Sequence, residues 1–320
     1  MSAFHSGLAD QLTAFVAFKR SLGFKYHVEA EMLQRFDRWI LTQPKDPRQL
    51  TQALVEGWVT RGPLEGERTN SRRIGLMRHL GLYLNTIGQE AYIAEPLRPT
   101  RHYTFVPYIF TLHELERIFT EADRLRPHRR STLPLVLPVM LRVLYGCGLR
   151  ISEATQLQVE HVHWDDGVLE IRNSKFGKDR LTPMSTSLAS VCRDYANTVH
   201  SSSSSTAYFF CHQDGGPISP NTIYRGFRDV LWYAGIPHRG KGKGPRVHDF
   251  RHSFAVHALK AAVDRQVDLY AALPILSAYL GHASITATEQ YVRLTADAFP
   301  EIRQQLDQTT GWVIPEVAWE

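Results

Sequence analysis

A proline-rich segment with no apolar periodicity divides this chain into two unequal parts, and it constrains the fold more than any other feature. It spans residues 96–108 and contains three prolines, Pro96, Pro99 and Pro107. Proline lacks a backbone N–H and favours an extended, semi-rigid connection. A chain of 320 residues is long enough to bury two separate cores. We therefore predict domains at residues 1–95 and 109–305, with a linker at 96–108 between them and a tail at 306–320.

Before this segment, apolar residues recur at three- and four-residue steps, which is the spacing of one face of an α-helix. Four such runs are present, namely Leu8 to Leu22, Val28 to Trp39, Leu50 to Trp58 and Ile74 to Ile87. Glycine follows the first and the last run, and prolines follow the second, so these runs end at residues that stop helices. The sequence predicts a compact four-helix domain.

After the segment, signals for helices alternate with signals for strands. Thr111, with a glutamate three residues later, is typical of a capping box, and Ser219-Pro220 predicts a second helix start. Residues 168–172 and 180–183 predict two strands of a hairpin with Gly177 in its turn. The expected fold is mainly α with a small antiparallel β-sheet, in which a helical N-terminal domain precedes a mixed α/β domain.

The charge balance favours a polyanionic partner. Lysine and arginine exceed aspartate and glutamate by 37 − 32 = 5, and the sequence pI is about 9.1. The polar faces of the four predicted helices carry basic residues, namely Lys19, Arg20, Lys25, Arg68, Arg72, Arg73 and Arg78. In an isolated domain such residues are typical of solvated helix faces. Beside a domain that cuts DNA, the same residues would contact phosphates.

The cysteines and the apolar runs argue against several classes of protein. Cys147, Cys192 and Cys211 are odd in number and form no CxxC pair, so neither a disulfide framework nor a zinc knuckle is supported. A reducing setting is the simpler interpretation. The chain does not open with a basic segment followed by an apolar one, and no apolar run approaches the length of a membrane span. We therefore expect a cytoplasmic protein that has no membrane partner.

Dense polar clusters stand out in the second part. Arg150 and Glu153 are three residues apart, so on a helix they share a face. The glycines before Arg150 would place it near a helix start, where it could face an anion. The alternative is a surface ion pair of little consequence. His248 and Arg251 show the same spacing further along the chain.

The second part of the chain also contains several histidines near the polar clusters. His248, His252 and His257 could be mistaken for a zinc site, but no HExxH pattern accompanies them, so we expect no metal. His282 and Tyr291 are nine residues apart and would point to opposite sides of one continuous helix. We predict a loop followed by a new helix, which would let both face one site. A tyrosine at such a position is otherwise most often a half-buried core residue.

In order, the motifs Arg150-Ile-Ser-Glu153, His248-x-x-Arg251 and Leu280-Gly281-His282, followed by Tyr291, resemble the tyrosine recombinase (phage integrase) family. Each motif is weak alone, and their order makes the set specific. The resemblance extends from about residue 110 to about residue 300, whereas the first hundred residues share only the architecture. Features around His282 and Tyr291 lean toward a transposon-associated branch. The stretch around residues 261–272 is several residues longer than is usual in the family, which leaves its local geometry open.

The resemblance implies an enzyme that cleaves and rejoins DNA at specific sites without a metal or any other cofactor. Tyr291 would attack the phosphodiester within its own active site and form a 3′-phosphotyrosyl intermediate. Arg150, Arg251 and His282 would stabilise the charge on the phosphate oxygens. Glu153 would support this set by holding Arg150 in place.

The same resemblance implies roles in proton transfer and in DNA binding. His248 would accept the tyrosine proton. A lysine of the predicted hairpin, Lys175 in preference to its competitor Lys178, would protonate the leaving 5′ oxygen. Further DNA contacts are expected from basic side chains in both domains, namely Lys25, Arg72, Arg73, Lys178, Lys241 and Lys243.

The resemblance also implies an assembly. Residues 1–95 would be a core-binding (SAM-like) DNA-binding domain and residues 109–305 the catalytic domain. The partner would be double-stranded DNA at the nucleoid, bound by four copies on two sites, with a Holliday-junction intermediate and with accessory recombinases or DNA-bending proteins as further partners. The apolar residues 311–319 would dock on a neighbouring protomer or fold back on their own domain. The alternatives are a catalytically inactive DNA-binding regulator and a type IB topoisomerase-like enzyme that relaxes DNA.

Overall fold

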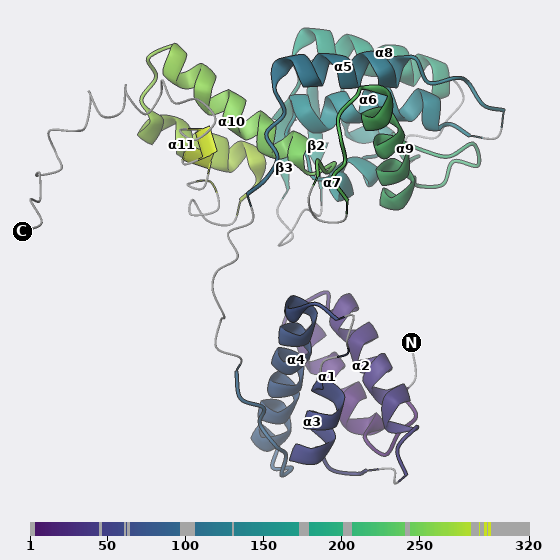
Figure 1. Ribbon diagram of the computed structural model, residues 1–320, viewed down its shortest axis with the longest axis vertical. Helices are drawn as coiled ribbons and strands as arrows, with labels where there is room; N and C mark the ends of the chain where they lie inside the picture. The colour runs from purple at the N-terminus through teal and green to yellow at the C-terminus, as the bar shows by residue number, and fades with distance from the viewer. Residues whose placement is uncertain are drawn as a thin grey trace, which may run out of the picture. The chain divides into compact units, whose positions relative to one another are not determined.

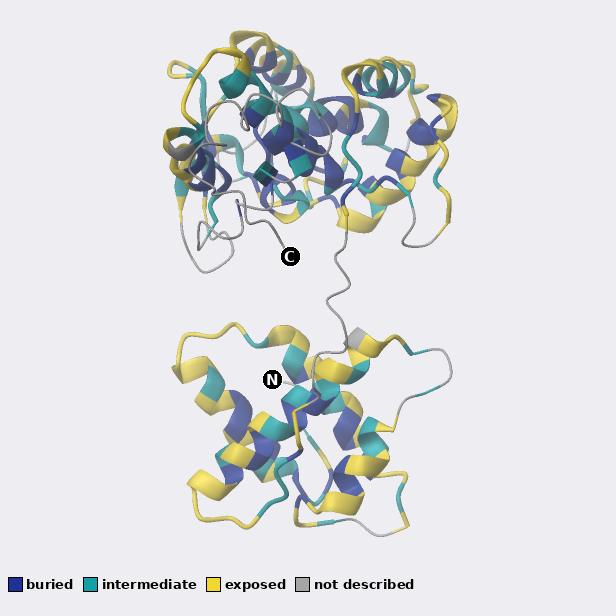
Figure 2. Cartoon of the chain, turned by 60° about the vertical axis from the view of Figure 1, so that its left-hand side comes forward, coloured by how far each residue is buried: buried dark blue, intermediate teal, exposed yellow. Residues whose placement is uncertain are grey.

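The computed structural model shows a chain built mainly of helices (Figure 1). It describes residues 4–44, 47–60, 62, 65–96, 106–129, 131–172, 179–200, 207–240, 244–282, 288, 291–292 and 294–295. The chain divides into two compact units, Met1–Thr104 and Phe105–Glu320. Each unit buries its own apolar residues, which lie on the inward faces of its helices (Figure 2). No helix among these residues is long and apolar enough to cross a membrane.

The part of the first unit that is described contains four helices, α1 (Ala9–Ser21), α2 (His27–Ile40), α3 (Gln52–Val59) and α4 (Glu67–Thr86). Their apolar faces meet in one core, whose fully covered members include Leu12, Phe15, Leu33, Phe36 and Met77. The helical periodicity therefore predicted these four elements correctly. It overstated burial at the turn between α1 and α2, where Leu22 is 56% and Val28 52% exposed.

A buried carboxylate on α2 fixes the chain that leads into α1. Asp37 is 2% exposed. Its Oδ2 accepts a hydrogen bond from the backbone N–H of His5 at 2.9 Å, and its Oδ1 accepts one from Ser6 at 3.0 Å. These N–H groups precede the helix and would otherwise be buried without partners, so Asp37 satisfies them and sets where α1 begins.

In the described part of the second unit, the elements follow in the order α5 (Leu112–Asp123), α6 (Leu133–Gly146), α7 (Ile151–Thr155), the 3-10 helix η1 (Val159–His161), β1 (Val162–His163), β2 (Val168–Ile171), β3 (Arg180–Pro183), α8 (Thr186–Val199), α9 (Pro220–Tyr233), α10 (Asp249–Asp264) and α11 (Leu269–Leu280). Helix α6 is apolar nearly all round, as expected for a helix buried on every side. It packs against α5, α8, α9 and α10 and so forms the centre of this unit.

Both predicted helix starts are present. The hydroxyl of Thr111 accepts from the N–H of Glu114 at 3.2 Å, and the Glu114 carboxylate accepts from the N–H of Thr111 at 2.8 Å. This reciprocal pair is the capping box that opens α5. The hydroxyl of Ser219 accepts from the N–H of Thr222 at 3.2 Å at the start of α9, with Pro220 as the first helical residue.

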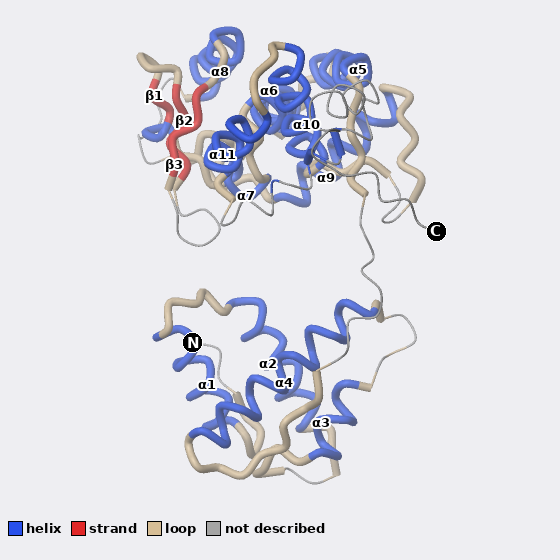
Figure 3. Tube along the Cα trace, turned by 90° about the vertical axis from the view of Figure 1, so that its left-hand side faces the viewer, coloured by secondary structure: helices blue, strands red, loops and turns tan. Residues whose placement is uncertain are grey.

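The three strands form one small antiparallel sheet in the order β1-β2-β3 (Figure 3). Val168 pairs with Pro183 and Ile171 with Arg180, which is the register of a hairpin. The sequence predicted β2 and β3 within one residue. It did not predict β1, because a strand of two residues has no period to detect.

Candidate active site

The site is built where three helix ends of the second unit meet. Arg150 is the N-cap residue of α7, directly after the chain leaves α6. The turn between them requires Gly148, because its φ is +58° and a Cβ there would lie 2.6 Å from the ring of Phe254. This turn exposes the carbonyl of Gly148 to α10, where Nη1 of Arg251 donates to it at 2.7 Å.

Arg251 is the largest fully buried side chain of the described residues, with 1% exposure. Besides Gly148, it donates from Nη2 to the carbonyl of Leu280 at 2.6 Å. Both acceptors are main-chain oxygens at the ends of other elements, so the guanidinium joins the α6–α7 turn to the end of α11. Burial and the neighbouring charge of Arg150 lower the pKa of Arg251 to about 10, which still leaves it charged at neutral pH.

One carboxylate, that of Glu153, connects the arginines. Its side chain is 3% exposed, and it accepts from the backbone N–H of Arg150 at 2.9 Å and from Nη1 of Arg150 at 2.6 Å. Arg180 donates to both of its oxygens, at 3.0 Å and 2.8 Å. Arg251 Nη1 lies 3.9 Å away. Burial alone would raise the pKa of Glu153, but hydrogen bonds and charge from Arg180 and Arg150 hold it down at about 2.

Arg180 is a member of this site that was not predicted from the sequence. The predicted hairpin has Arg180 on its second strand, whereas the lysines predicted to be functional lie between the two strands. Side chains two residues apart on a strand share a face, but packing and not the local sequence determines whether that face is buried. Arg180 therefore lies on the same face as Thr182, which is completely buried. An arginine on a buried strand face requires a buried partner for its charge.

Tyr291 lies inside the second unit with 1% exposure, packed with residues of α10 and α11. Its hydroxyl is 3.1 Å from Nδ1 of His252, and its ring stacks on that of His282 at a centroid distance of 6.1 Å. Helix α11 ends at Leu280, and residues 291–292 are helical again. His282 and Tyr291 thus share one site, although no single helix carries both.

From the sequence, His252 was considered only as a possible zinc ligand, and that interpretation was rejected. In the structure it lies beside the proposed nucleophile. Its ring lies between the Tyr291 hydroxyl and the ring of His248, whose centroid is 4.8 Å away. Burial is the main cause that lowers the pKa of His252 to about 3 and the pKa of His248 to about 4. Both imidazoles are therefore neutral at neutral pH, and a neutral imidazole carries one unprotonated ring nitrogen.

These pKa shifts predict that the second unit loses stability on mild acidification. In the folded chain His252 resists protonation, but in the unfolded chain it protonates near its ordinary value of 6.5. The free energy of unfolding is therefore unaffected by the protonation of His252 above about pH 6.5. Below that pH the unfolded chain takes up a proton that the folded chain does not, and the free energy of unfolding falls by up to about 1.4 kcal/mol per pH unit. Urea unfolding of wild type and His252→Asn at about pH 8 and about pH 5 measures this. The control His113→Gln removes an exposed histidine and should leave the slope unchanged. Equal slopes for wild type and His252→Asn would contradict the prediction.

Several predicted residues lie outside the part of the chain that is described. They are Lys175 and Lys178 of the hairpin turn, Lys241 and Lys243 of the glycine-rich loop, and the tail at residues 306–320. Within the described ranges, no cluster of three or more histidine, cysteine, aspartate or glutamate side chains could hold a metal ion. The lengthened stretch at residues 261–272 comprises the end of α10, the turn after it and the start of α11.

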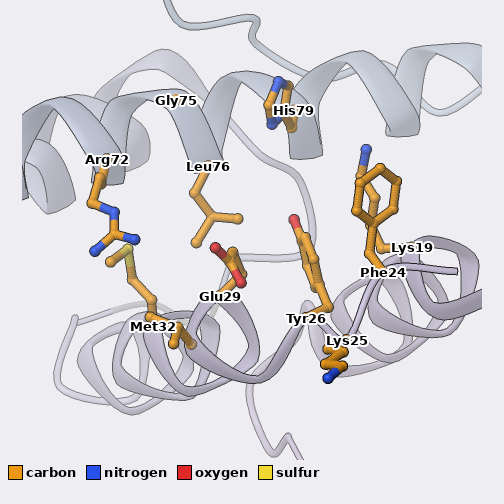
Figure 4. A pocket seen from close by; sticks show the side chains of 11 residues that line it. Lys19, Phe24, Lys25, Tyr26, Glu29, Met32, Arg72, Gly75, Leu76 and His79 are labelled. Carbon is orange, nitrogen blue, oxygen red and sulfur yellow. The ribbon is translucent and has the colours of Figure 1, made fainter. Parts of the chain in front are cut away.

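In the first unit, two of the predicted DNA-binding residues border one cavity, at opposite ends of it in Figure 4. Lys25 and Arg72 line a cavity of about 410 Å³ between the α1–α2 turn and α4, together with Lys19 and His79 (Figure 4). Burial is the main cause that lowers the pKa of His79, and the charges of Lys19 and Arg78 add to it. The acidic side chain of Glu29 also lines this cavity.

Arg73 lies elsewhere, although it follows Arg72 in the sequence. It pairs with Glu65, donates to the carbonyl of Thr60 at 3.3 Å, and places its guanidinium 5.2 Å from the ring centre of Trp58. These partners hold it against α3 and the chain that follows α3. The sequence could not separate the two arginines, because only the packing of α4 determines which of its faces meets α3.

Known proteins similar to this chain point to one family. The model of the phage integrase family matches residues 109–297. A putative integrase/recombinase of Sinorhizobium fredii, y4rB, is 28% identical over 96% of this chain and 98% of its own length. The tyrosine recombinase XerA of Pyrococcus furiosus is 30% identical over 59% of this chain and 68% of its own length.

Two solved structures share the fold at low identity. The Tn1549 transposon integrase in complex with transposon right end DNA superposes with a TM-score of 0.62, at 15% identity over 91% of this chain and 99% of its own. The XerH site-specific recombinase bound to its difH substrate gives 0.61, at 16% identity over 89% and 79%. The match of the family model covers more than half of the sequence and includes all the motifs from Arg150 to Tyr291, and it shows that this chain belongs to the phage integrase family of tyrosine recombinases.

Proposed function

We propose that this chain is a site-specific DNA recombinase that cleaves and rejoins strands through a covalent bond to Tyr291. The observation that carries the proposal is the convergence of three guanidinium groups on one buried carboxylate. Arg150, Arg180 and Arg251 supply three positive charges, and Glu153 supplies one negative charge within 4 Å of each of them. This excess of positive charge beside a buried tyrosine suits a phosphodiester, which is anionic and becomes more so when it is attacked.

Two of these arginines, Arg150 and Arg251, are proposed to bind the phosphate. Nη2 of Arg150 donates to the carbonyl of Gly281 at 3.3 Å, and Nη2 of Arg251 donates to the preceding carbonyl, that of Leu280. Because the acceptors are successive oxygens of one turn, the two guanidinium groups lie close together. Their mutual repulsion is relieved when an anion binds between them. A guanidinium also offers a planar fork that matches two phosphate oxygens, which an ammonium group does not.

The tyrosine proton has a defined neighbour. Burial raises the pKa of Tyr291, and the charges of Arg251 and Arg150 act in the opposite direction. In the proposed step the phenol oxygen bonds to phosphorus, and the phenol proton passes to an imidazole, His252 in direct contact or His248 beside it. The bond from phosphorus to the 5′ oxygen breaks, and that oxygen takes a proton from Lys175, the residue that the family resemblance assigns to it.

The proposal is tested with a nicked duplex that traps the cleaved state. Wild-type protein is expected to form a species that survives denaturation, and peptide mapping should place the nucleotide on Tyr291. Sequencing the attached DNA identifies the recombination site. Transfer of the strand to a second duplex supports recombination, whereas relaxation of supercoils without any exchange indicates a topoisomerase. Absence of an adduct under all conditions would indicate a DNA-binding regulator.

Double-stranded DNA is the proposed partner, and the cavity in the first unit is a proposed contact to its backbone. Lys25→Gln and Arg72→Gln are each expected to lower the slope of log affinity against log salt concentration by about 1. The loss should be similar for specific and unspecific DNA, because phosphate contacts carry no sequence information. Arg38→Gln is the control, since Arg38 is exposed on α2 and donates only locally, to the carbonyl of Gln34. An unchanged slope for both cavity variants would show that the residues lining the cavity do not contact the DNA backbone.

The finer parts of the proposal concern assembly. Four copies would act on two DNA sites and pass through a Holliday junction, with the tail at residues 311–320 docked on a neighbouring protomer. Analytical ultracentrifugation with one and with two equivalents of DNA sites tests the stoichiometry. Removing residues 311–320 should weaken cooperative assembly more than binding to a single site, and equal losses of both would refute the docking.

A further inference from the structure

Arg180 connects three elements of the site through one side chain. It opens β3 opposite Ile171, and its side chain is 9% exposed. Both terminal nitrogens donate to Glu153 of α7, and Nε donates to the carbonyl of Tyr279 in α11 at 2.9 Å. Every nitrogen of the guanidinium thus donates to protein, which fixes the orientation of Arg180 toward Glu153 and Tyr279.

The same side chain lies against the turn that precedes His282. Gly281 has a φ of +64°, and a Cβ added there would lie 3.0 Å from Nη1 of Arg180 and 3.2 Å from its Cδ. The far end of β3 is tied to the same helix, because the hydroxyl of Tyr279 donates to the carbonyl of Pro183 at 3.0 Å. The strand therefore holds the end of α11 at two points, and Arg180 is the point next to the site.

Arg180 also determines how Glu153 distributes its hydrogen bonds. The carboxylate receives a two-point contact from Arg180 and a single side-chain contact from Arg150. Without Arg180, a buried carboxylate would turn further toward Arg150 and Arg251, because these are its remaining positive neighbours. Their charge would then be neutralised by the protein and not by the phosphate.

We propose that Arg180 is a positioning residue for strand cleavage: it holds Glu153 so that Arg150 and Arg251 remain available to the phosphate, and it holds the turn before His282. The inference rests on the proposed function, since it assigns Arg180 a part in the same reaction. It adds to the predicted set a residue that contributes no atom to the chemistry.

A pH profile separates positioning from mere structural support. The charged or titratable groups that face Glu153 come from four segments, namely Arg150 of α7, Arg180 of β3, Arg251 and His248 of α10, and His282 after α11. With Arg180 present, the pKa of Glu153 is about 2, so Glu153 stays ionised at every pH at which the enzyme is assayed. Loss of Arg180 raises this pKa, because burial then has less opposing charge.

The first measurement is single-turnover formation of the covalent adduct on nicked DNA. Arg180→Met is expected to slow it about 100-fold, as small displacements of catalytic groups do. DNA affinity should stay within about 2-fold, because only the transition state loses an interaction. The rate of this variant should fall further on acidification, as Glu153 protonates. In the double variant Arg180→Met/Glu153→Gln this added acid sensitivity should disappear, because position 153 can no longer be protonated. Acid sensitivity caused by His282 would instead persist in the double variant.

The second measurement needs no DNA and therefore stands apart from the proposed function. Wild type should be more stable than Arg180→Met at neutral pH, and the difference should shrink on acidification. The sign follows because a depressed carboxylate pKa stabilises the fold above the unfolded pKa and is lost as pH falls through the folded one. Arg180→Lys keeps the positive charge but loses the planar, two-point guanidinium contact. Its cleavage rate and its stability should lie between those of wild type and Arg180→Met. If Arg180→Met does not fold, both measurements are made on Arg180→Lys instead.

Three results would overturn the inference. They are a wild-type rate for Arg180→Met, a defect that resides entirely in DNA affinity, and an acid sensitivity that persists in the double variant. Arg193→Met is the control, because Arg193 donates to the carbonyl of Trp164 on the surface and should change neither profile. If wild type itself forms no adduct, the proposed function fails, and the unfolding experiment alone then decides whether Arg180 governs Glu153.

Discussion

Protein carrying Tyr291→Phe is expected to bind DNA with unchanged affinity and to form no covalent adduct with it. The substitution removes one oxygen from a ring that is 1% exposed and leaves its packing in place. The lost hydroxyl is the proposed nucleophile, and no other group takes its role, so the rate should fall by at least about 10⁴-fold. The fold should lose no more than about 1 kcal/mol, the worth of one hydrogen bond to His252.

Denaturing gels of the nicked-substrate reaction measure the adduct, and gel shifts measure binding. Tyr195→Phe is the matched control, since Tyr195 is also buried, at 5% exposure, but packs with Phe209 and Phe210 in an apolar cluster that does not include Tyr291. It should form the adduct at the wild-type rate. An undiminished adduct with Tyr291→Phe would show that another residue attacks the phosphate.

Arg251→Lys is expected to slow cleavage about 10³-fold although the charge is retained. Arg251 donates through two different nitrogens to the carbonyls of Gly148 and Leu280, and its geometry is set by both. A lysine ammonium is a single point, so it can satisfy one of these oxygens or the phosphate but cannot span the site. The carbonyl left without a donor is buried, which adds a cost of about 1–3 kcal/mol to the folded state.

Single-turnover cleavage and urea unfolding measure the two effects of this substitution separately. Arg142→Lys serves as the control, because Arg142 also forms a two-point contact, with Asp123, but at the surface. Its replacement should change neither the rate nor the stability by a measurable amount. A cleavage rate within a few-fold of wild type for Arg251→Lys would mean that the fork of Arg251 is not used in the reaction.

The sequence predicted the elements better than it predicted the contacts between them. Periodicity located α1 to α4, and cap chemistry located the starts of α5 and α9, because both signals lie within a few neighbouring residues. The order of the polar motifs predicted the family, which the family model confirms. The expectation of a mainly helical fold with a small antiparallel sheet was also correct.

Sequence reasoning did not find the residues whose importance arises only from packing. Arg180 is separated from Glu153 by 27 residues and from Tyr279 by 99, so no local pattern relates them. His252 was considered only as a metal ligand, and its contact with Tyr291 was not predicted because the two residues are 39 positions apart in the sequence. The roles predicted for Arg150, His248, Arg251, His282 and Tyr291 remain predictions, and the experiments on Tyr291 and Arg251 address them directly.

The anchoring of Arg251 has a consequence for how such a site can diverge. Both of its acceptors are main-chain oxygens, and every amino acid at positions 148 and 280 would supply the same oxygen. Substitution at Leu280 therefore cannot delete its acceptor, and at Gly148 the choice of residue is limited by the positive φ and by the closeness of Phe254, not by the need for an acceptor. The arginine is held by the path of the chain and not by particular side chains, so mutational drift in the surrounding sequence is tolerated wherever that path is kept.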